Sequence, residues 1–253
     1  MNIEKELKIR RRAITVPTLF IIAGLLVLLS PILCISALII STVSKYSTTV
    51  NALFFIYGYV FFECAGVFAL TFSWITAANE DQLLEKTRTI QGWWSRGLLK
   101  LGTTLYQLEF FVTGTQDIKG ASAILMPCHT SLADTVLPMV FFAQRRNEGL
   151  RYVLKKELLA LPCLDIAGNR LPNLFVDRSG RDTERELRSL RDLLLSTPKN
   201  QSILIYPEGT RNSLAKRRSL KNKNTRVTRL LERWPNLLPP RTGGSLTLLQ
   251  ENL

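Results

Sequence analysis

Apolar residues divide the chain into an apolar N-terminal part and a mixed remainder. Residues 14–41 contain no charged side chain, and residues 52–77 form a second apolar run that is interrupted only by Glu63. At about 1.5 Å per helical residue, both runs are long enough to span a bilayer. Pro31 predicts a kink in the first run. The pattern therefore predicts two membrane helices, at about 14–41 and 52–77.

The charges that flank these runs predict their orientation. The connection between the runs carries one basic residue, Lys45, whereas five precede the first run: Lys5, Lys8, Arg10, Arg11 and Arg12. By the positive-inside rule, both ends of the hairpin lie on the cytoplasmic side. Residues 1–78 are thus expected to form the membrane hairpin of an integral membrane protein whose N-terminus and remaining chain are cytoplasmic.

Glu63 lies near the middle of the second run, where a carboxylate is costly. One interpretation is a neutral or paired glutamic acid that bonds within the hairpin, toward the first helix. The other is a contact with a lipid head group or with a partner helix.

Residues 79–105 repeat apolar side chains at helical spacing, and they predict a helix within a linker at 79–108. Trp93 and Trp94 stand beside Arg96 and Lys100, which is typical of a helix at a membrane interface. A linker helix packed on the rest of the protein fits the same pattern. The sequence does not separate the two.

From residue 109 onward, short apolar runs alternate with helical patterns. The expected strands are 110–113, 123–128, 151–154, 174–177 and 202–206, and the expected helices are 131–145, 157–166 and 181–196. Such alternation is typical of an α/β domain with a mostly parallel sheet flanked by helices. Residues 109–253 are predicted to form this domain, with its ligand site at the carboxyl ends of the strands.

The charge balance narrows the class of partner. The chain has 33 Lys and Arg against 20 Asp and Glu, a net charge of +13, which indicates an anionic partner. Eight basic residues fall within 216–233 and are opposed only by Glu232. They are suited to an anionic partner such as lipid head groups, although a solvated loop is an equally good interpretation. Nucleic acid is disfavoured, because the chain has membrane runs and lacks an aromatic stacking motif.

Cysteine usage points to a reducing compartment. The four cysteines show neither paired metal-ligand spacing nor a dense disulfide framework.

His129 is the only histidine, so imidazole acid–base chemistry has one candidate. Asp134 follows five residues later, and with Ser131 it also fits a capping box at the start of a helix. The two roles are compatible. His129 precedes the helix, and a first-turn carboxylate points back toward the N-terminus, so the two side chains can meet. A carboxylate there fixes the imidazole tautomer and stabilises the imidazolium.

Two rival nucleophiles are disfavoured. Cys128 precedes His129 on an expected strand, where adjacent side chains point to opposite faces. No Gly-x-Ser-x-Gly motif is present to supply a catalytic serine.

Three further motifs carry candidate binding residues. These are Phe175-Val-Asp-Arg178, Tyr206-Pro-Glu-Gly-Thr-Arg211, and the turn Pro239-Pro-Arg-Thr-Gly-Gly244 before an expected helix whose N-terminus can face an anion. Gly209 would let the backbone approach a ligand closely. Taken singly, Arg178 and Arg211 are more often surface charges.

Together these motifs resemble the four ordered blocks of the glycerolipid acyltransferases. The matching residues are His129-Thr-Ser-Leu-Ala-Asp134, Phe175-Val-Asp-Arg178, Pro207-Glu-Gly-Thr-Arg211 and Leu238-Pro-Pro-Arg-Thr-Gly243. The set is most similar to 1-acylglycerol-3-phosphate acyltransferases and their lysophospholipid-acylating relatives. The resemblance covers roughly residues 110–244, and a membrane hairpin also occurs in such enzymes.

The resemblance implies a reaction and assigns roles. His129 would be the general base and Asp134 would orient it, so that the acceptor hydroxyl attacks the acyl thioester directly. Arg178 and Arg211 would hold the acceptor phosphate. Glu208, Gly209 and Thr210 would position the glycerol, and Pro240 would line the acyl or donor site. The donor would be acyl-CoA or acyl-carrier-protein, the acceptor a lysophospholipid, foremost 1-acylglycerol-3-phosphate, and no metal or other cofactor is implied.

Three features depart from the family pattern. Cys128 stands where the family often has asparagine, and Pro172-Asn173-Leu174 lacks an expected glycine. The chain also ends nine residues after Gly244, which is early for this fold and leaves a C-terminal truncation open. Two alternatives therefore stay open: acylation of another lysophospholipid, and a non-catalytic membrane protein that binds anionic lipid through a decayed site.

Overall fold

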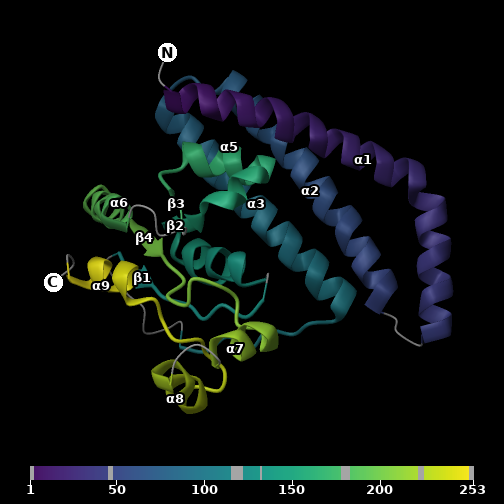
Figure 1. The fold of residues 1–253 in the computed structure, drawn as a ribbon. Coiled ribbons are helices and arrows are strands. Elements are labelled where there is room, and N and C mark those ends of the chain that lie inside the picture. Colours follow the sequence, from purple (N-terminus) through teal and green to yellow (C-terminus); the bar gives the residue numbers. More distant parts are fainter. Residues whose placement is uncertain are drawn as a thin grey trace. The chain divides into compact units, whose positions relative to one another are not determined.

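The computed structural model describes residues 3–44, 48–114, 122–131, 133–177, 183–221 and 225–250 (Figure 1). It divides into two compact units. The first comprises Met1–Thr113 with Glu157–Leu171, and the second Gly114–Lys156 with Pro172–Leu253. The segment 157–171 thus packs with the N-terminal helices, although it lies in the middle of the catalytic sequence pattern.

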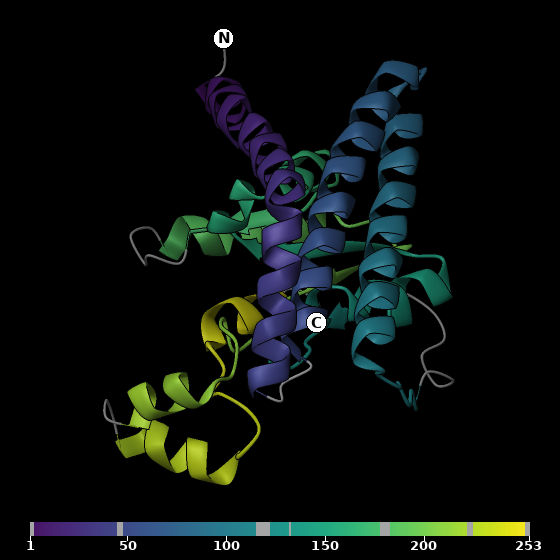
Figure 2. The ribbon, with the colours of Figure 1, turned by 90° about the vertical axis from the view of Figure 1, so that its right-hand side faces the viewer.

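The first unit is built from long helices. They are α1 (Ile3–Ser44), α2 (Thr48–Thr76) and α3 (Glu80–Tyr106), together with the shorter α5 (Pro162–Arg170). By length and composition, α1 and α2 are each able to cross a membrane. Figures 1 and 2 show α2 between α1 and α3. The two predicted apolar runs therefore lie within two long helices that pack as a hairpin.

Helix α3 packs on α2 through small residues. A Cβ atom at Gly97 would lie 2.2 Å from Cε1 of Phe62, and one at Gly58 would lie 2.3 Å from Cδ2 of Leu101. The Trp93 and Phe62 rings contact each other at a tilt of 56°, with their centroids 5.1 Å apart. The predicted linker helix is thus a helix packed against α2, and its contact with a membrane stays a prediction.

Glu63 has partners on α5 and on α2 itself. Its side chain is buried, and Oε2 accepts a hydrogen bond from the backbone N–H of Cys163, at the N-terminus of α5, at 3.3 Å. The side chain of Tyr59, on α2 itself, also interacts with this carboxyl group, so Glu63 has a partner within the hairpin as well. The contact with Cys163 places the carboxyl group at the N-terminus of a helix that comes from 100 residues further along the chain.

The second unit contains a parallel four-stranded sheet. Its order is β1-β4-β2-β3, with β1 at Ile124–Leu125, β2 at Gly149–Lys155, β3 at Leu174–Val176 and β4 at Gln201–Leu204. All three pairings are parallel, which confirms the predicted α/β class. Residues 110–113 form no strand, so that prediction is wrong. Phe111 is 89% exposed there, because the segment extends beyond α3 without a neighbouring strand.

Side-chain alternation along β4 gives the sheet two covered faces. Ile203 and Ile205 belong to a core cluster with Leu190 of α6 (Thr183–Leu195) and Leu248 of α9 (Thr242–Gln250). Leu204 and Tyr206 belong to the opposite cluster, with the helical turn Met139–Ala143 and α4 (Gln144–Arg146) beside it. Tyr206 therefore lies on the face covered by the segment that follows His129.

Two predicted helices and the predicted basic loop differ from their predictions. The segment 131–145 contains a tight turn at Ala133–Thr135 and a wide turn at Met139–Ala143 instead of one regular helix. The segment 157–166 begins as a tight turn, and α5 starts only at Pro162, whose fixed φ suits the first helical position. The expected basic loop is a pair of helices, α7 (Leu214–Lys221) and α8 (Thr225–Arg233).

Arg217 joins α7 to the end of α8 through hydrogen bonds. Its guanidinium donates hydrogen bonds to the backbone carbonyls of Leu231 at 2.6 Å and Leu237 at 2.9 Å. Because the last carbonyls of a helix lack partners within it, a cation there stabilises the end of α8. Arg217, one of the eight basic residues, thus stabilises the fold of this stretch.

Candidate active site

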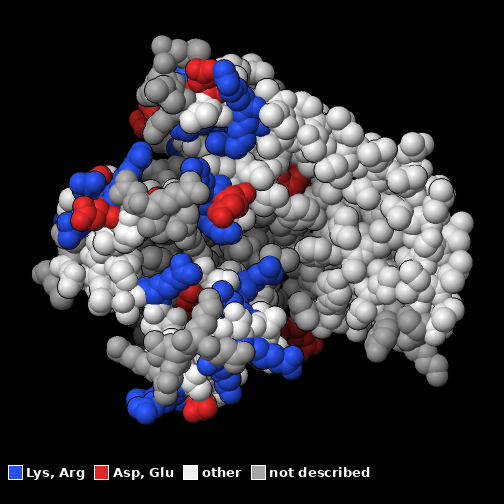
Figure 3. Space-filling model, in the orientation of Figure 1, with Lys and Arg blue, Asp and Glu red and all other residues white. Residues whose placement is uncertain are grey.

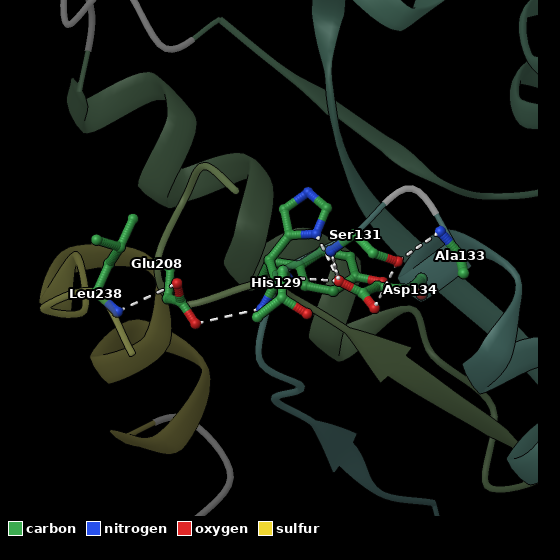
Figure 4. A network of polar contacts seen from close by, with 8 residues as sticks. His129, Ser131, Ala133, Asp134, Glu208 and Leu238 are labelled. Carbon is green, nitrogen blue, oxygen red and sulfur yellow. Dashed lines mark hydrogen bonds and ion pairs between the residues drawn. The ribbon is translucent and has the colours of Figure 1, made fainter. Parts of the chain in front are cut away.

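His129 and Asp134 meet in the loop that follows β1 (Figure 4). The imidazole Nδ1 lies 3.2 Å from Oδ2 of Asp134, and both side chains are largely buried, with 17% and 14% exposed. A carboxylate can only accept, so this contact requires the hydrogen on Nδ1. Nε2 then carries the lone pair, and in Figure 4 it points away from Asp134.

Asp134 also holds the backbone of the same loop. Its Oδ2 accepts hydrogen bonds from the backbone N–H of Thr130 at 2.6 Å and of Ser131 at 2.7 Å. The Ser131 hydroxyl in turn accepts from the N–H of Ala133 at 2.9 Å. The capping contacts and the imidazole contact therefore exist together, as the sequence predicted. Three donors on one carboxylate oxygen fix its position beside the imidazole.

Tyr206, two residues after the end of β4, supports the pair, and the sequence patterns did not assign it a role. Its ring stacks on that of His129, with centroids 4.5 Å apart and planes at 31°. Its hydroxyl donates to the backbone carbonyl of Asp134. Burial raises the pKa of the Tyr206 phenol well above its ordinary value, and the negative charge of Asp134 raises it further. The phenol therefore remains a neutral hydrogen-bond donor.

Glu208 joins two loops on the carboxyl side of the sheet. It is 6% exposed, and its Oε1 accepts from the N–H of His129 at 3.2 Å while Oε2 accepts from the N–H of Leu238 at 3.3 Å. Two backbone hydrogen bonds join the same loops. The N–H of Asn212 donates to the His129 carbonyl at 2.6 Å, and the N–H of Arg241 donates to the Pro207 carbonyl at 2.8 Å. The first, third and fourth sequence motifs are thus tied together.

Gly209 is the point where the third and fourth motifs touch most closely. Its φ of +66° is in the left-handed region, and a Cβ atom there would lie 3.0 Å from Cδ of Arg241. Both the conformation and the space favour glycine. The Arg241 side chain consequently lies over the backbone of the third motif, which the sequence patterns did not indicate.

The other predicted site residues differ in their exposure, and one of them is not described by the structure. Arg211 and Pro240 are exposed, and Thr210 is half-buried. Within the described residues, no carboxylate lies at ion-pair distance from Arg211 or Arg241. Arg178 lies outside the described residues. Cys128 is exposed and lies beyond the end of β1, so strand alternation does not determine its direction.

Sequence comparison identifies the protein class. The sequence model of the Acyltransferase family matches residues 109–243, slightly more than half of the chain. This chain belongs to the Acyltransferase family. Membership implies acyl transfer to a glycerolipid, from an acyl donor to an acceptor substrate. No curated protein and no solved structure shows significant similarity to the chain.

Within this acyltransferase, we expect Glu208→Gln to lower both stability and turnover. A glutamine has one accepting oxygen and one donating nitrogen, so one of the two backbone N–H groups would lose its acceptor, at a cost of about 1–3 kcal/mol. The loop of His129 would then be less firmly placed, and kcat would fall together with the midpoint of thermal unfolding. Purified protein in detergent allows both to be measured.

The matched control is Glu232→Gln, the same change at an exposed carboxylate of α8. It should change neither quantity. A different result at Glu208, with unfolding unchanged and only the KM for the acceptor raised, would show that the carboxylate contacts substrate instead of bracing the loops.

Proposed function

We propose that this chain moves a fatty acyl group from an acyl thioester to the free hydroxyl of 1-acylglycerol-3-phosphate, giving phosphatidic acid. The observation that carries the proposal is the His129–Asp134 pair, with Nδ1 held at 3.2 Å from the carboxylate and Nε2 turned away from it. The intact pair favours catalysis over a decayed, purely lipid-binding site.

The proposed chemistry is general-base catalysis without a covalent enzyme intermediate. Nε2 of His129 takes the proton of the acceptor hydroxyl while that oxygen attacks the thioester carbonyl. Asp134 stabilises the imidazolium that results. The tetrahedral intermediate then collapses with cleavage of the carbon–sulfur bond, and the leaving thiolate takes the proton back from Nε2. The ester, the free thiol and the original imidazole result.

The proposed phosphate site is formed by arginines of the binding motifs. Arg211 is exposed and next to Asn212, whose N–H bonds the His129 carbonyl, so its backbone is tied to the catalytic loop. An arginine without a carboxylate partner among the described residues is available for a phosphate, which a guanidinium binds in bidentate fashion. Arg178 is proposed for the same anion on the strength of its motif, with Gly209 and Thr210 near the glycerol and Pro240 near the acyl or donor chain.

The proposed location is a membrane, with the N-terminus and the second unit on its cytoplasmic side. Its support is the pair of long apolar helices α1 and α2 and the five basic residues that precede residue 14. Attachment to the membrane would bring the enzyme to a lipid acceptor and release a lipid product where both reside. Acyl-CoA and acyl-carrier-protein both fit as donors.

Replacing Arg211 by alanine tests the acceptor assignment. We expect the KM for 1-acylglycerol-3-phosphate to rise about ten- to a hundredfold, since a hydrogen bond to a charged group contributes about 1.5–3 kcal/mol. The KM for the acyl thioester and for monoacylglycerol, which lacks the phosphate, should stay unchanged. The measurement is initial-rate kinetics with both acceptors, with Arg218→Ala on the exposed side of α7 as the matched control.

If Arg211→Ala raised only the KM for the thioester, the arginine would serve the donor. If both acceptors were affected equally, the proposed recognition of phosphate at this position would be wrong.

A further inference from the structure

His129 becomes a cation during the reaction proposed above, and the second unit is an unfavourable place for one. In Gly114–Lys156 and Pro172–Leu253 the sequence holds 22 Lys and Arg residues against 11 Asp and Glu. In Figure 3, Lys and Arg side chains are spread over the surface of α6, α7 and α8. Their summed potential opposes a further positive charge. Rapid proton abstraction therefore needs groups close to the imidazole that stabilise its protonated form.

Two carboxylates lie near residue 129, and neither covers the face of its ring (Figure 4). Oδ2 of Asp134 contacts Nδ1 at the ring edge at 3.2 Å, and the same oxygen accepts from the N–H groups of Thr130 and Ser131. Both oxygens of Glu208 accept from backbone N–H groups, one of which is that of His129 itself. The face of the imidazole is thus left to another group.

The ring of Tyr206 covers that face. The two ring centroids are 4.5 Å apart, and the ring planes make an angle of 31°. A cation over an aromatic ring, within about 6 Å of its centroid, is attracted by the negative face of the π system. A neutral imidazole gains only an ordinary stacking contact from the same arrangement. The contact therefore strengthens when His129 takes up the proton, and an interaction that strengthens toward the transition state accelerates the step.

The Tyr206 ring is held firmly in this position. Its hydroxyl donates to the backbone carbonyl of Asp134, and its own backbone carbonyl accepts from the N–H of Gly209 at 3.0 Å. The residue is 8% exposed, within the core cluster that also contains Tyr152 and Leu204. The phenol is neutral, because burial and the charge of Asp134 both raise its pKa. The imidazole therefore faces the π system of a neutral ring.

We propose that Tyr206 is a positioning residue that acts through His129: its ring holds the imidazole in place and stabilises the imidazolium by a cation–π contact. Asp134 and Tyr206 thus have separate roles, since one acts at the edge of the imidazole and the other at its face. The tyrosine hydroxyl serves to fix the ring, so the aromatic face carries most of the effect on rate. This inference rests on the general-base role of His129 in the proposed function.

Graded fluorination of the ring at position 206 tests the proposal. Fluorine draws electrons from the π face and weakens a cation–π contact with little change in ring shape. Tyr206→Phe is compared with versions of that variant whose phenylalanine carries one, two or three fluorine atoms, introduced at a reassigned stop codon. The measurement is kcat for acyl transfer at saturating substrates, at a pH high enough that His129 is neutral in every variant.

We expect Tyr206→Phe to keep kcat within about fivefold of the wild type, because it keeps the aromatic face and loses one hydrogen bond. From no fluorine to three, kcat should then fall about three- to tenfold in even steps, with the KM for both substrates unchanged. Tyr206→Leu, which removes the π system, should lower kcat at least as far as the trifluorinated ring does.

Tyr152 supplies the matched control series. It lies on β2 in the same buried cluster and is 7% exposed, whereas the ring in contact with His129 is that of Tyr206. Tyr152→Phe and its fluorinated versions should have kcat values within about twofold of one another, and thermal unfolding midpoints should be alike within each fluorinated series. A constant kcat across the series at 206, with activity and unfolding midpoint lost together in Tyr206→Leu, would show that the ring only packs and would overturn the proposal.

The single histidine gives a second readout that does not require activity. With carbon-13 in its histidine rings the chain contains one labelled imidazole, whose NMR signal is followed against pH in detergent. Weaker stabilisation of the imidazolium should move the midpoint of this titration about 0.5–1 pH unit lower between no fluorine and three. Asp134 and Glu208, the other titratable groups in contact with residue 129 within the described part of the chain, are unchanged in the series, as is the exposed neighbour Cys128.

The two readouts separate failure of this inference from failure of the proposed function. A midpoint that does not move with fluorination would overturn the cation–π contact, whatever the rates. Absent acyl transfer in the wild-type chain, together with the expected movement of the midpoint, would instead overturn the proposed function and leave the contact between Tyr206 and the imidazolium supported.

Discussion

Replacing His129 by alanine is expected to lower kcat for acyl transfer by at least about 10²- to 10⁴-fold, the usual contribution of a positioned general base. No other histidine exists in the chain to take its place. The backbone contacts of residue 129, to Glu208 and to Asn212, do not involve the imidazole and should persist. The loss should therefore appear in kcat with the protein folded and membrane-bound, measured with labelled acyl thioester and 1-acylglycerol-3-phosphate.

Thermal unfolding of the His129→Ala protein separates chemistry from folding. A midpoint near that of the wild type, with activity lost, would support the assignment of the base. Turnover within about threefold of the wild type would show that the proton is removed by another group, and the proposed mechanism would then be wrong.

The second large effect is expected for Asp134→Asn. One carboxylate oxygen, Oδ2, makes the contacts with Nδ1 of His129 and with the N–H groups of Thr130 and Ser131. In asparagine the amide oxygen can take this place and keep all three contacts, but it carries no negative charge. The imidazolium that forms when Nε2 takes the hydroxyl proton is then not stabilised by a carboxylate, and kcat should fall about 10²- to 10⁴-fold with little change in the KM for either substrate.

Asp192→Asn is the matched control, because Asp192 is an exposed carboxylate on α6. It should leave kcat unchanged. A wild-type kcat in Asp134→Asn would mean that the contact seen at 3.2 Å serves only to cap the loop.

The local part of the site could be read from the sequence. The meeting of His129 and Asp134 depends on the geometry of a few consecutive residues after a strand, and that geometry is largely fixed by the chain itself. The parallel sheet followed from the alternation of apolar runs and helical patterns for a similar reason. Strand ends were less predictable: β1 pairs over only two residues, because pairing depends on a neighbour from distant sequence.

Contacts between residues that are far apart in the sequence could not be predicted from it. The brace of Glu208 joins residues that are 79 and 30 positions away, and nothing in a Pro-Glu-Gly-Thr motif states that both carboxylate oxygens turn toward backbone N–H groups. Tyr206 is similar, since its stacking on His129 depends on which sheet face it occupies. A tyrosine at the end of a predicted parallel strand next to the strand of the histidine was the available signal.

The path of residues 157–171 shows the same limit on a larger scale. Their sequence fits a helix of the α/β domain, and the prediction placed them there. In the structure they pack on α1 and α2, because Asp165 forms ion pairs with Arg11 and Arg12 and the N-terminus of α5 donates a hydrogen bond to Glu63. The midspan glutamate was visible in the sequence, but its contact with a residue 100 positions away was not.

The central claim is acyl transfer to the hydroxyl of a phosphorylated lysolipid, and one assay tests it most directly. Membranes containing the wild-type chain are supplied with radiolabelled acyl-CoA, or in parallel acyl-carrier-protein, and with 1-acylglycerol-3-phosphate or monoacylglycerol. We expect labelled phosphatidic acid in proportion to the amount of enzyme, with a kcat/KM at least about tenfold above that for monoacylglycerol. Absence of labelled phosphatidic acid with both donors, in membranes that contain the folded chain, would contradict the account.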